Sequence, residues 1–210
     1  MTRPFLLHLA TAEDVGEITQ LIDETGAWLR DKIGTDQWNR PWPDEKARDA
    51  RVRDGVDRGR TWLLHDGRTL VASVTVEVSG KPGLWSEEEL RTPAVYLHRL
   101  VINRHYKGMR IGSFLIDWGA HRGLAEKPSA EELRIDTWST NRRLHAYYIG
   151  QGFTKIPGIR VTEDETPSGQ LLSKPIGAVL PREELAGILQ VVEEESVPVR
   201  AEQAEPAGQL

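Results

Sequence analysis

Hydrophobic residues along this chain follow two periods, one typical of helices and one typical of strands. Over residues 12–30, apolar or small side chains recur every three or four positions, which predicts an amphipathic helix: Val15, Ile18, Ile22, Thr25 and Leu29. Short β-branched and apolar runs bounded by turn residues predict strands at 5–9, 61–65, 69–78, 95–102, 133–138, 154–161 and 170–173. Asp66-Gly67 is a favoured hairpin turn between two of these runs. The alternation indicates a fold of the α/β (α+β) class.

Three further helices separate these strands. Residues 44–58 predict a second and more polar helix, an apolar helix follows Gly112, and a helix led by Asn141 continues over 142–150. The segment 31–43 contains Gly and Pro and predicts a loop.

The composition changes beyond Pro175. Residues 181–194 predict an amphipathic helix, because four apolar residues recur on one face: Leu185, Ile188, Leu189 and Val192. This helix either docks on its own domain or binds a partner. We therefore expect a domain over 1–174, a helical extension over 175–195 and a flexible tail over 196–210.

Composition and charge narrow the function. The chain has 210 residues, of which 39% are hydrophobic, and this suits one domain with a packed core. A net charge of −5 argues against general binding of nucleic acid. The absence of cysteine excludes disulfides, thiolate metal sites and a cysteine nucleophile, and the histidines show no spacing typical of a metal site. The N-terminal segment resembles neither a signal peptide nor a membrane span, so we expect a cytoplasmic protein without membrane binding.

A basic, glycine-bearing turn joins the 95–102 run to the next helix. It reads Lys107-Gly108-Met109-Arg110-Ile111-Gly112. The first amides of a helix lack intrahelical partners and, with the helix dipole, favour a phosphate group. Gly108 and Gly112 allow close approach of the backbone, and Lys107 and Arg110 add positive charge. The turn matches neither the dinucleotide fingerprint nor the nucleoside-triphosphate loop, and by itself it is equally typical of an ordinary connection on a basic surface.

A second block lies further along the chain. Five of its residues match the pattern N-x-x-L-x-x-x-Y-x-x-x-G-F: Asn141, Leu144, Tyr148, Gly152 and Phe153. Together with the preceding turn, this block resembles the GNAT superfamily of N-acetyltransferases, whose donor motif is Q/R-x-x-G-x-G/A. Two turn positions depart from that motif, because Lys107 replaces Gln or Arg and Arg110 replaces the first motif glycine.

The resemblance implies a GNAT fold, with a mixed central sheet of about six or seven strands flanked by about four helices, plus a C-terminal extension. It also implies acetyl-CoA as the acyl donor and no metal. In this family the pantetheine arm pairs with the backbone at the end of the fourth strand, here Leu100, Val101 and Ile102. The pyrophosphate lies on the amides of the turn, here Lys107, Gly108, Met109, Arg110, Ile111, Gly112 and the adjoining Ser113. Asn141 would contact the pantetheine arm, cap its helix, or do both.

The chemistry requires a polarised carbonyl, a neutral amine and a proton donor for the departing thiolate. A chain without cysteine favours direct attack in a ternary complex. By resemblance, Tyr148 lies beside the CoA sulfur and acts as the acid, although the spacing alone favours a core aromatic. Many family members carry a glutamate base on the strand before the turn, and this chain offers Tyr96 and His98 there instead. His98 is either the base or a hydrogen-bonded structural histidine.

The resemblance implies an amine acceptor, either a small molecule or a peptide, and its pocket is expected at the first two helices and the loop between them. Trp28, Trp38 and Trp42 are concentrated there and either hold the acceptor or anchor the loop. The segment 34–38 resembles a stretch found in a bacterial subset of the superfamily. Dimers are common in the superfamily, so a homodimer is one expectation.

Two alternatives stay open at this point. The chain is either an N-acetyltransferase or a CoA-binding regulatory module that has lost turnover and uses the 181–194 helix for interaction. A transferase of another acyl group, or to a hydroxyl acceptor, is a further alternative within the same fold.

Overall fold

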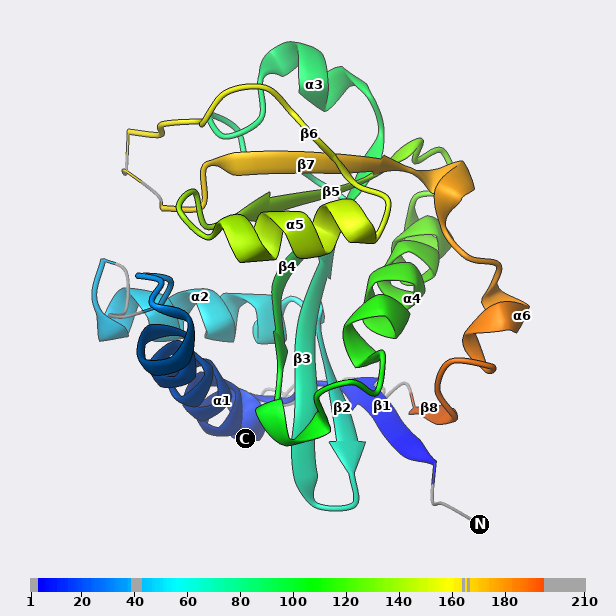
Figure 1. Ribbon diagram of the computed structural model, residues 1–210. Coiled ribbons are helices and arrows are strands. Elements are labelled where there is room, and N and C mark those ends of the chain that lie inside the picture. Colours follow the sequence, from blue (N-terminus) through cyan, green and yellow to red (C-terminus); the bar gives the residue numbers. More distant parts are fainter. Residues whose placement is uncertain (1–3, 39–42, 164, 166, 195–210) are drawn as a thin grey trace, which may run out of the picture.

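The computed structural model describes residues 4–38, 43–163, 165 and 167–194. Within these residues a mixed sheet of eight strands forms the centre of the molecule, in the order β6-β7-β5-β4-β3-β2-β1-β8 (Figure 1). The strands are β1 Phe5–Leu9, β2 Thr61–Asp66, β3 Thr69–Glu77, β4 Ala94–Ile102, β5 Glu132–Thr137, β6 Thr154–Lys155, β7 Gln170–Pro175 and β8 Val191–Glu194.

Helices cover both faces of this sheet. They are α1 Val15–Trp28, α2 Glu45–Asp57, α3 Glu87–Arg91, α4 Ile111–Glu126, α5 Arg142–Gly150 and α6 Arg182–Leu185. Short 3-10 turns lie at Ala12–Asp14, Arg104–Tyr106 and Ile176–Ala178, and a π-helical turn at Leu29–Ile33 extends α1. Figure 1 shows α1 and α2 beside one face of the sheet and α4 beside the other.

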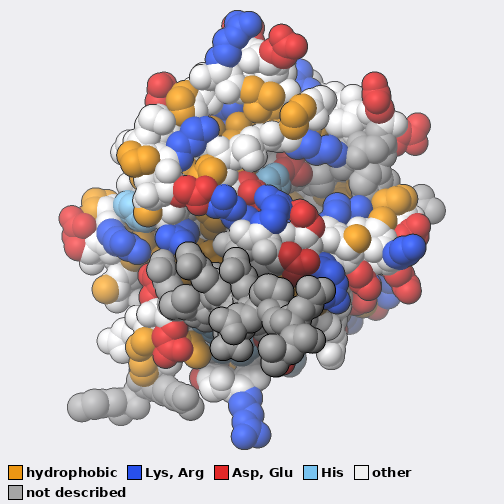
Figure 2. Space-filling view, turned by 180° about the vertical axis from the view of Figure 1, so that it is seen from behind, with side chains coloured by type: hydrophobic (Ala, Val, Ile, Leu, Met, Phe, Trp, Pro, Cys, Tyr) orange, Lys and Arg blue, Asp and Glu red, His pale blue; other side chains and the backbone are white. Residues whose placement is uncertain are grey.

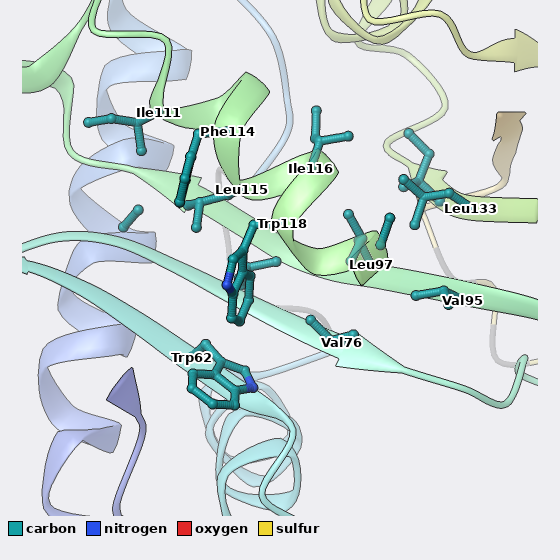
Figure 3. Packing of buried hydrophobic residues seen from close by; sticks show 14 of the residues in the cluster. Trp62, Val76, Val95, Leu97, Ile111, Phe114, Leu115, Ile116, Trp118 and Leu133 are labelled. Carbon is teal, nitrogen blue, oxygen red and sulfur yellow. The ribbon is translucent and has the colours of Figure 1, made fainter. Parts of the chain in front are cut away.

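Two hydrophobic clusters hold these layers together. The larger one joins α4 and α5 to the sheet and centres on Trp62, Trp118 and Leu115, each at most 2% exposed (Figure 3). The rings of Trp62 and Trp118 meet edge to face with centroids 5.1 Å apart. The second cluster joins α1 and α2 to the other face through residues such as Ile18 and Val56. Burial of these side chains fixes both helical layers relative to the sheet.

An irregularity in β4 opens the middle of the sheet. The register with β3 shifts between Ser73 and Thr75, which face Val101 and His98 respectively, so β4 carries an extra residue there. Arg99, in this bulge, has a left-handed φ of 49°. The parallel pairing of β4 with β5 runs from Ala94 opposite Glu132 to Leu97 opposite Ile135. Beyond Leu97 the two strands diverge, as Figure 1 shows.

The C-terminal extension differs from the expected helix. Helix α6 spans only Arg182–Leu185, and Val191–Glu194 form β8, which runs parallel to β1. The prediction of a single helix over 181–194 was therefore wrong. Helix-compatible spacing of apolar residues does not exclude a strand, and the free edge of β1 offers backbone hydrogen bonds, such as Phe5 N to Gln190 O at 3.0 Å. The proposed tail, 196–210, lies outside the described residues.

Helix α3 lies in the stretch 79–93, where only a connection was expected, and the other helices and strands agree with the sequence prediction apart from their limits. β8 brings the sheet to eight strands where six or seven were expected, and β6 is confined to Thr154–Lys155 of the predicted 154–161 run. The face seen in Figure 2 carries Lys and Arg side chains interspersed with Asp and Glu side chains. None of the described helices combines the length and apolar character that crossing a membrane requires.

Candidate functional site

A cavity of about 1310 Å³ lies where β4 and β5 diverge. One end reaches the turn before α4, and the other extends between α1, α2 and the sheet. Its walls include the end of β4 from Leu97 to Ile102, the start of α4, and Tyr147 and Tyr148 of α5. The cavity therefore brings together most of the residues that the sequence singled out, although they come from distant parts of the chain.

The turn before α4 presents its amides to this cavity. The first hydrogen bond of the helix runs from Phe114 N to Arg110 O at 3.0 Å, which leaves the amides of Ile111, Gly112 and Ser113 without intrahelical partners. A Cβ on Gly112 would overlap the Tyr147 hydroxyl, so a larger residue there would displace that side chain. These features fit a pyrophosphate group held at the N-terminus of α4.

Arg110 occupies the position where the family motif has glycine. Its φ of 59° lies in the left-handed region, which explains the preference for glycine there and imposes a strain of about 1 kcal/mol on a residue with a Cβ. The Arg110 side chain is exposed, as are those of Lys107 and Met109. Both cations are therefore accessible to an anion at the turn.

Tyr148 lies deep in the wall of the cavity. Its ring packs edge to face against Tyr147 and Phe153, with centroids 5.3 and 5.5 Å away. No hydrogen bond of its hydroxyl is present among the described residues. Burial, with smaller contributions from Tyr147 and Asp136, raises the pKa of Tyr148 above its usual value. The hydroxyl thus remains protonated at neutral pH and is available as a donor.

His98 also lines the cavity and lies beside the carboxylate of Asp136. Its Nδ1 atom is 2.9 Å from Oδ1 of Asp136 on β5, and the two side chains are 22% and 16% exposed. Asp136 Oδ1 has no well-aligned hydrogen bond among the described residues, so the contact is a close charge–dipole approach rather than a directed bond. The sequence signal for this pair was an acidic residue in the middle of a predicted strand. The pair itself forms because β5 runs parallel to β4, which places the ends of the two strands beside each other.

Tyr96 does not reach the cavity. It is 2% exposed, its ring meets Trp85 edge to face, and its hydroxyl accepts a hydrogen bond from Arg134 at 3.1 Å. The structure thus places Tyr96 away from the other predicted site residues: it precedes the point at which β4 and β5 separate, and its side chain packs beneath α3.

The tryptophans of the predicted acceptor pocket have different surroundings. Trp28 lines the cavity and stacks under the Arg104 guanidinium, 3.8 Å from the ring centroid. Trp38 also lines it, with a φ of 58°, and packs against the cluster between α1 and α2. Trp42 lies outside the described residues. Trp28 and Trp38 therefore lie at the cavity, but each of them also packs against other residues of the protein.

The loop after α1 is docked onto the start of α5. Asn141 caps α5 by accepting a hydrogen bond from Leu144 N at 3.0 Å, and its amide nitrogen donates to Gln37. Asp36 accepts hydrogen bonds from Trp138 and Thr140. Asn141 lines the cavity while making both contacts, so its predicted approach to the pantetheine arm stays a prediction.

Over the ranges that the structure describes, no three or more His, Asp or Glu side chains are grouped so that they could hold a metal ion.

Comparisons with known proteins agree with this architecture. The family model described as "Acetyltransferase (GNAT) family" matches residues 27–153. The uncharacterized N-acetyltransferase YesJ of Bacillus subtilis (strain 168) is 26% identical over 148 residues, which cover 69% of this chain and 78% of that protein.

Solved structures show the same fold. A GNAT family acetyltransferase from Listeria monocytogenes superposes with a TM-score of 0.60 at 20% identity, covering 81% of this chain and 94% of that one. The aminoglycoside acetyltransferase AAC(6')-Ib, solved with ribostamycin and coenzyme A, gives a TM-score of 0.59 at 17% identity, covering 84% and 96%. Because the family match spans more than half of the chain and includes both the donor turn and the Tyr148 block, the chain belongs to the acetyltransferase (GNAT) family.

Proposed function

We propose that this protein transfers an acetyl group from acetyl-CoA to a primary amine by direct attack within a ternary complex. One observation carries the proposal: a single cavity contains the open amides before α4, the protonated Tyr148 and the His98–Asp136 pair. These groups are the anion site, the proton donor and the proton acceptor that the reaction requires. The aminoglycoside acetyltransferase with the same fold was solved with coenzyme A and its acceptor, which supports an amine acceptor here.

The donor end of the cavity would hold CoA. When bound, acetyl-CoA supplies the thioester that the amine attacks. The amides of Ile111, Gly112 and Ser113 would bind the pyrophosphate, with Lys107 and Arg110 adding charge. The backbone of Leu100 to Ile102, at the diverging end of β4, would pair with the pantetheine arm, and a backbone amide there would polarise the carbonyl.

The proton transfers would involve His98, Asp136 and Tyr148, which all line the cavity. His98 accepts a proton from the attacking amine, and Asp136 stabilises the resulting imidazolium at Nδ1. Tyr148 donates its hydroxyl proton to the departing sulfur. Burial raises the pKa of the Tyr148 phenol, so the group stays protonated at neutral pH and can donate a hydrogen bond to the sulfur as charge develops there.

The test measures acyl transfer with a library of amines. We expect CoA release from acetyl-CoA that depends on the acceptor, and a product heavier by one acetyl group in mass spectrometry. His98→Gln and Asp136→Asn should each lower kcat about 10²-fold without weakening CoA binding. His105→Gln is the matched control, since this exposed histidine contacts Asn103 and does not line the cavity.

Other outcomes would identify the alternatives. If CoA stabilises the protein but no amine is acylated, the chain is a CoA-binding module. Faster transfer from a longer acyl-CoA, or to a hydroxyl group, would show a different acyltransferase in the same fold.

A further inference from the structure

Arg99 brings a second polar side chain to the face of β4 that carries His98. In a regular strand consecutive residues point to opposite faces, so these neighbours would be separated by the sheet. The bulge changes this arrangement. His98 lies opposite Thr75 of β3, and the Arg99 guanidinium extends under α2 into the same region.

The position of that guanidinium is defined by Gly55 of α2. A Cβ at Gly55 would lie 2.9 Å from Nη2 of Arg99, 2.8 Å from Oγ1 of Thr61 and 3.5 Å from Cγ2 of Thr75. A larger residue would therefore displace the guanidinium or the two threonines. Arg99 also lines the cavity, so its side chain is both enclosed by α2 and directed at the space where an acceptor would bind.

Arg99 differs from Arg48 and Arg58 of the same wall, because no carboxylate of the described residues is paired with it. Arg48 is paired with Asp23 and Asp49, and Arg58 is paired with Asp54 and with Glu77, the latter at 2.6 Å. For Arg99, no hydrogen bond and no carboxylate oxygen within 4.0 Å is found among the described residues.

Arg99 is half-buried in this wall, and a cation that is partly removed from water without a paired carboxylate carries a desolvation cost. Burial lowers the pKa of Arg99, and Asp136 and Glu77 oppose that shift from a greater distance. The guanidinium nevertheless stays charged, because an arginine is not deprotonated in proteins. This surrounding favours binding of an anion from the cavity.

The neighbouring carboxylates limit which anion fits. Asp136 and Glu77 both act on Arg99, so a phosphate dianion would meet more repulsion there than a monoanion. The planar guanidinium matches a carboxylate, which it can bind through two parallel N–H donors. A carboxylate is therefore the group that suits this position.

We propose that the acceptor is a primary amine that also carries a carboxylate, and that Arg99 binds this carboxylate while the amine lies at His98. The inference rests on the proposed function, whose acceptor it defines. His98 contacts Asp136 on β5, whereas Arg99 reaches over β3 and β2, on the other side of β4. Because adjacent strands are about 4.8 Å apart, the two groups of the acceptor are separated by more than about 5 Å. A terminal amine on a flexible chain meets this requirement, and an amine on the carbon next to the carboxylate does not.

The test is a series of amino acids with a terminal amine: glycine, β-alanine, γ-aminobutyrate, δ-aminovalerate and ε-aminocaproate. Each is compared with its carboxamide as acceptor with acetyl-CoA, and as ligand of the CoA complex in calorimetry. For the native protein, kcat/KM and affinity should rise along the carboxylate series and exceed those of the longest carboxamides about 10²-fold. The carboxamide series should show no comparable preference.

Variants of Arg99 separate recognition from folding. Arg99→Asn removes the charge and keeps a residue that tolerates a left-handed φ, so it should fold, retain CoA binding and lose the preference for carboxylates. Arg99→Lys should restore part of the preference. Arg53→Gln removes an exposed cation of α2 that does not line the cavity, and it should leave the acceptor preference and the rate unchanged.

The results of these experiments distinguish the role of Arg99 from the proposed reaction. An equal response to carboxylates and carboxamides, or a preference that persists in Arg99→Asn, overturns the role of Arg99. Carboxylate binding that depends on Arg99 but occurs without acetyl transfer supports the site and overturns the proposed reaction. Absence of both binding and transfer throughout the series overturns the inference, while acetylation of other amines would leave the proposed function standing.

Discussion

Tyr147 and Tyr148 are neighbours on α5 with different surroundings. Tyr148 is 7% exposed and packs against Phe153, whereas Tyr147 is 39% exposed and its hydroxyl lies over Gly112. Burial, with a smaller contribution from Asp117, raises the pKa of Tyr147 to about 12. Both phenols are thus protonated at neutral pH, and their positions rather than their protonation distinguish their roles.

Replacing either hydroxyl tests this distinction. Tyr148→Phe should lower kcat about 10²-fold and leave CoA binding intact, because the ring packing is kept and only the proton donor is lost. Tyr147→Phe is the matched control and should change kcat far less. Steady-state kinetics and calorimetry with CoA provide the two readouts. Unchanged turnover in Tyr148→Phe would remove this residue from the acid role.

Single residues show what sequence reasoning reached and what it missed. The turn and Tyr148 could be predicted because they follow local motifs with fixed spacing. The roles of Asp136 and Arg99 could not, since the first depends on which strands are adjacent and the second on a left-handed φ that an arginine rarely adopts. The position of Tyr96 away from the cavity could not be predicted either, because alternation along β4 does not reveal where β5 separates from it.

At the scale of elements, β8 shows why apolar spacing alone was insufficient. Leu185, Leu189 and Val192 fit a helical face, yet Leu185 and Leu189 enter the core from a short helix and the turn after it, and Val192 belongs to a strand. The alternation over four residues was too short to identify that strand. The backbone hydrogen bonds that β1 offers therefore determine that residues 191–194 form a strand rather than a helix.

The two valines of β8 provide a test of this assignment. Val191 packs against the main cluster, whereas Val192 is 47% exposed. Val191→Asp should lower the free energy of unfolding by about 1–2 kcal/mol, because it places a charge against apolar side chains, and Val192→Asp should change it by less than about 0.5 kcal/mol. Urea denaturation measures both. A larger loss for Val192→Asp would contradict the strand, because a helix over 181–194 would bury Val192 on the same face as Leu185 and Leu189 and leave Val191 off that face.

At the scale of the whole molecule, the cavity lies between two parts of one sheet. The first four strands carry α1, α2 and the donor turn, and β5, β6 and β7 carry α5. A ligand that contacts both parts adds its binding free energy to the stability of the native state.

Binding of CoA should therefore stabilise the fold. At a concentration 100 times its Kd, CoA should raise the free energy of unfolding by about 2.7 kcal/mol, measured by denaturation with and without the ligand. Lys107→Glu and Arg110→Glu should reduce this gain, and more strongly at low salt, because both exposed cations lie at the turn. Arg53→Glu makes the same charge change on α2 and should not reduce it. A gain that is equal in all variants would exclude pyrophosphate binding at the turn.

The pairing of β8 with β1 has a further consequence for self-association. An uncovered edge strand is a template for another chain, and long apolar edges lead to intermolecular sheets. Here β8 covers β1 and presents Glu193 and Glu194 beside its two valines, while the opposite edge is formed by the two residues of β6. Acidic side chains on a short border strand oppose extension of the sheet by a second copy. A homodimer of this protein would accordingly form through helical or loop surfaces rather than by continuation of its sheet.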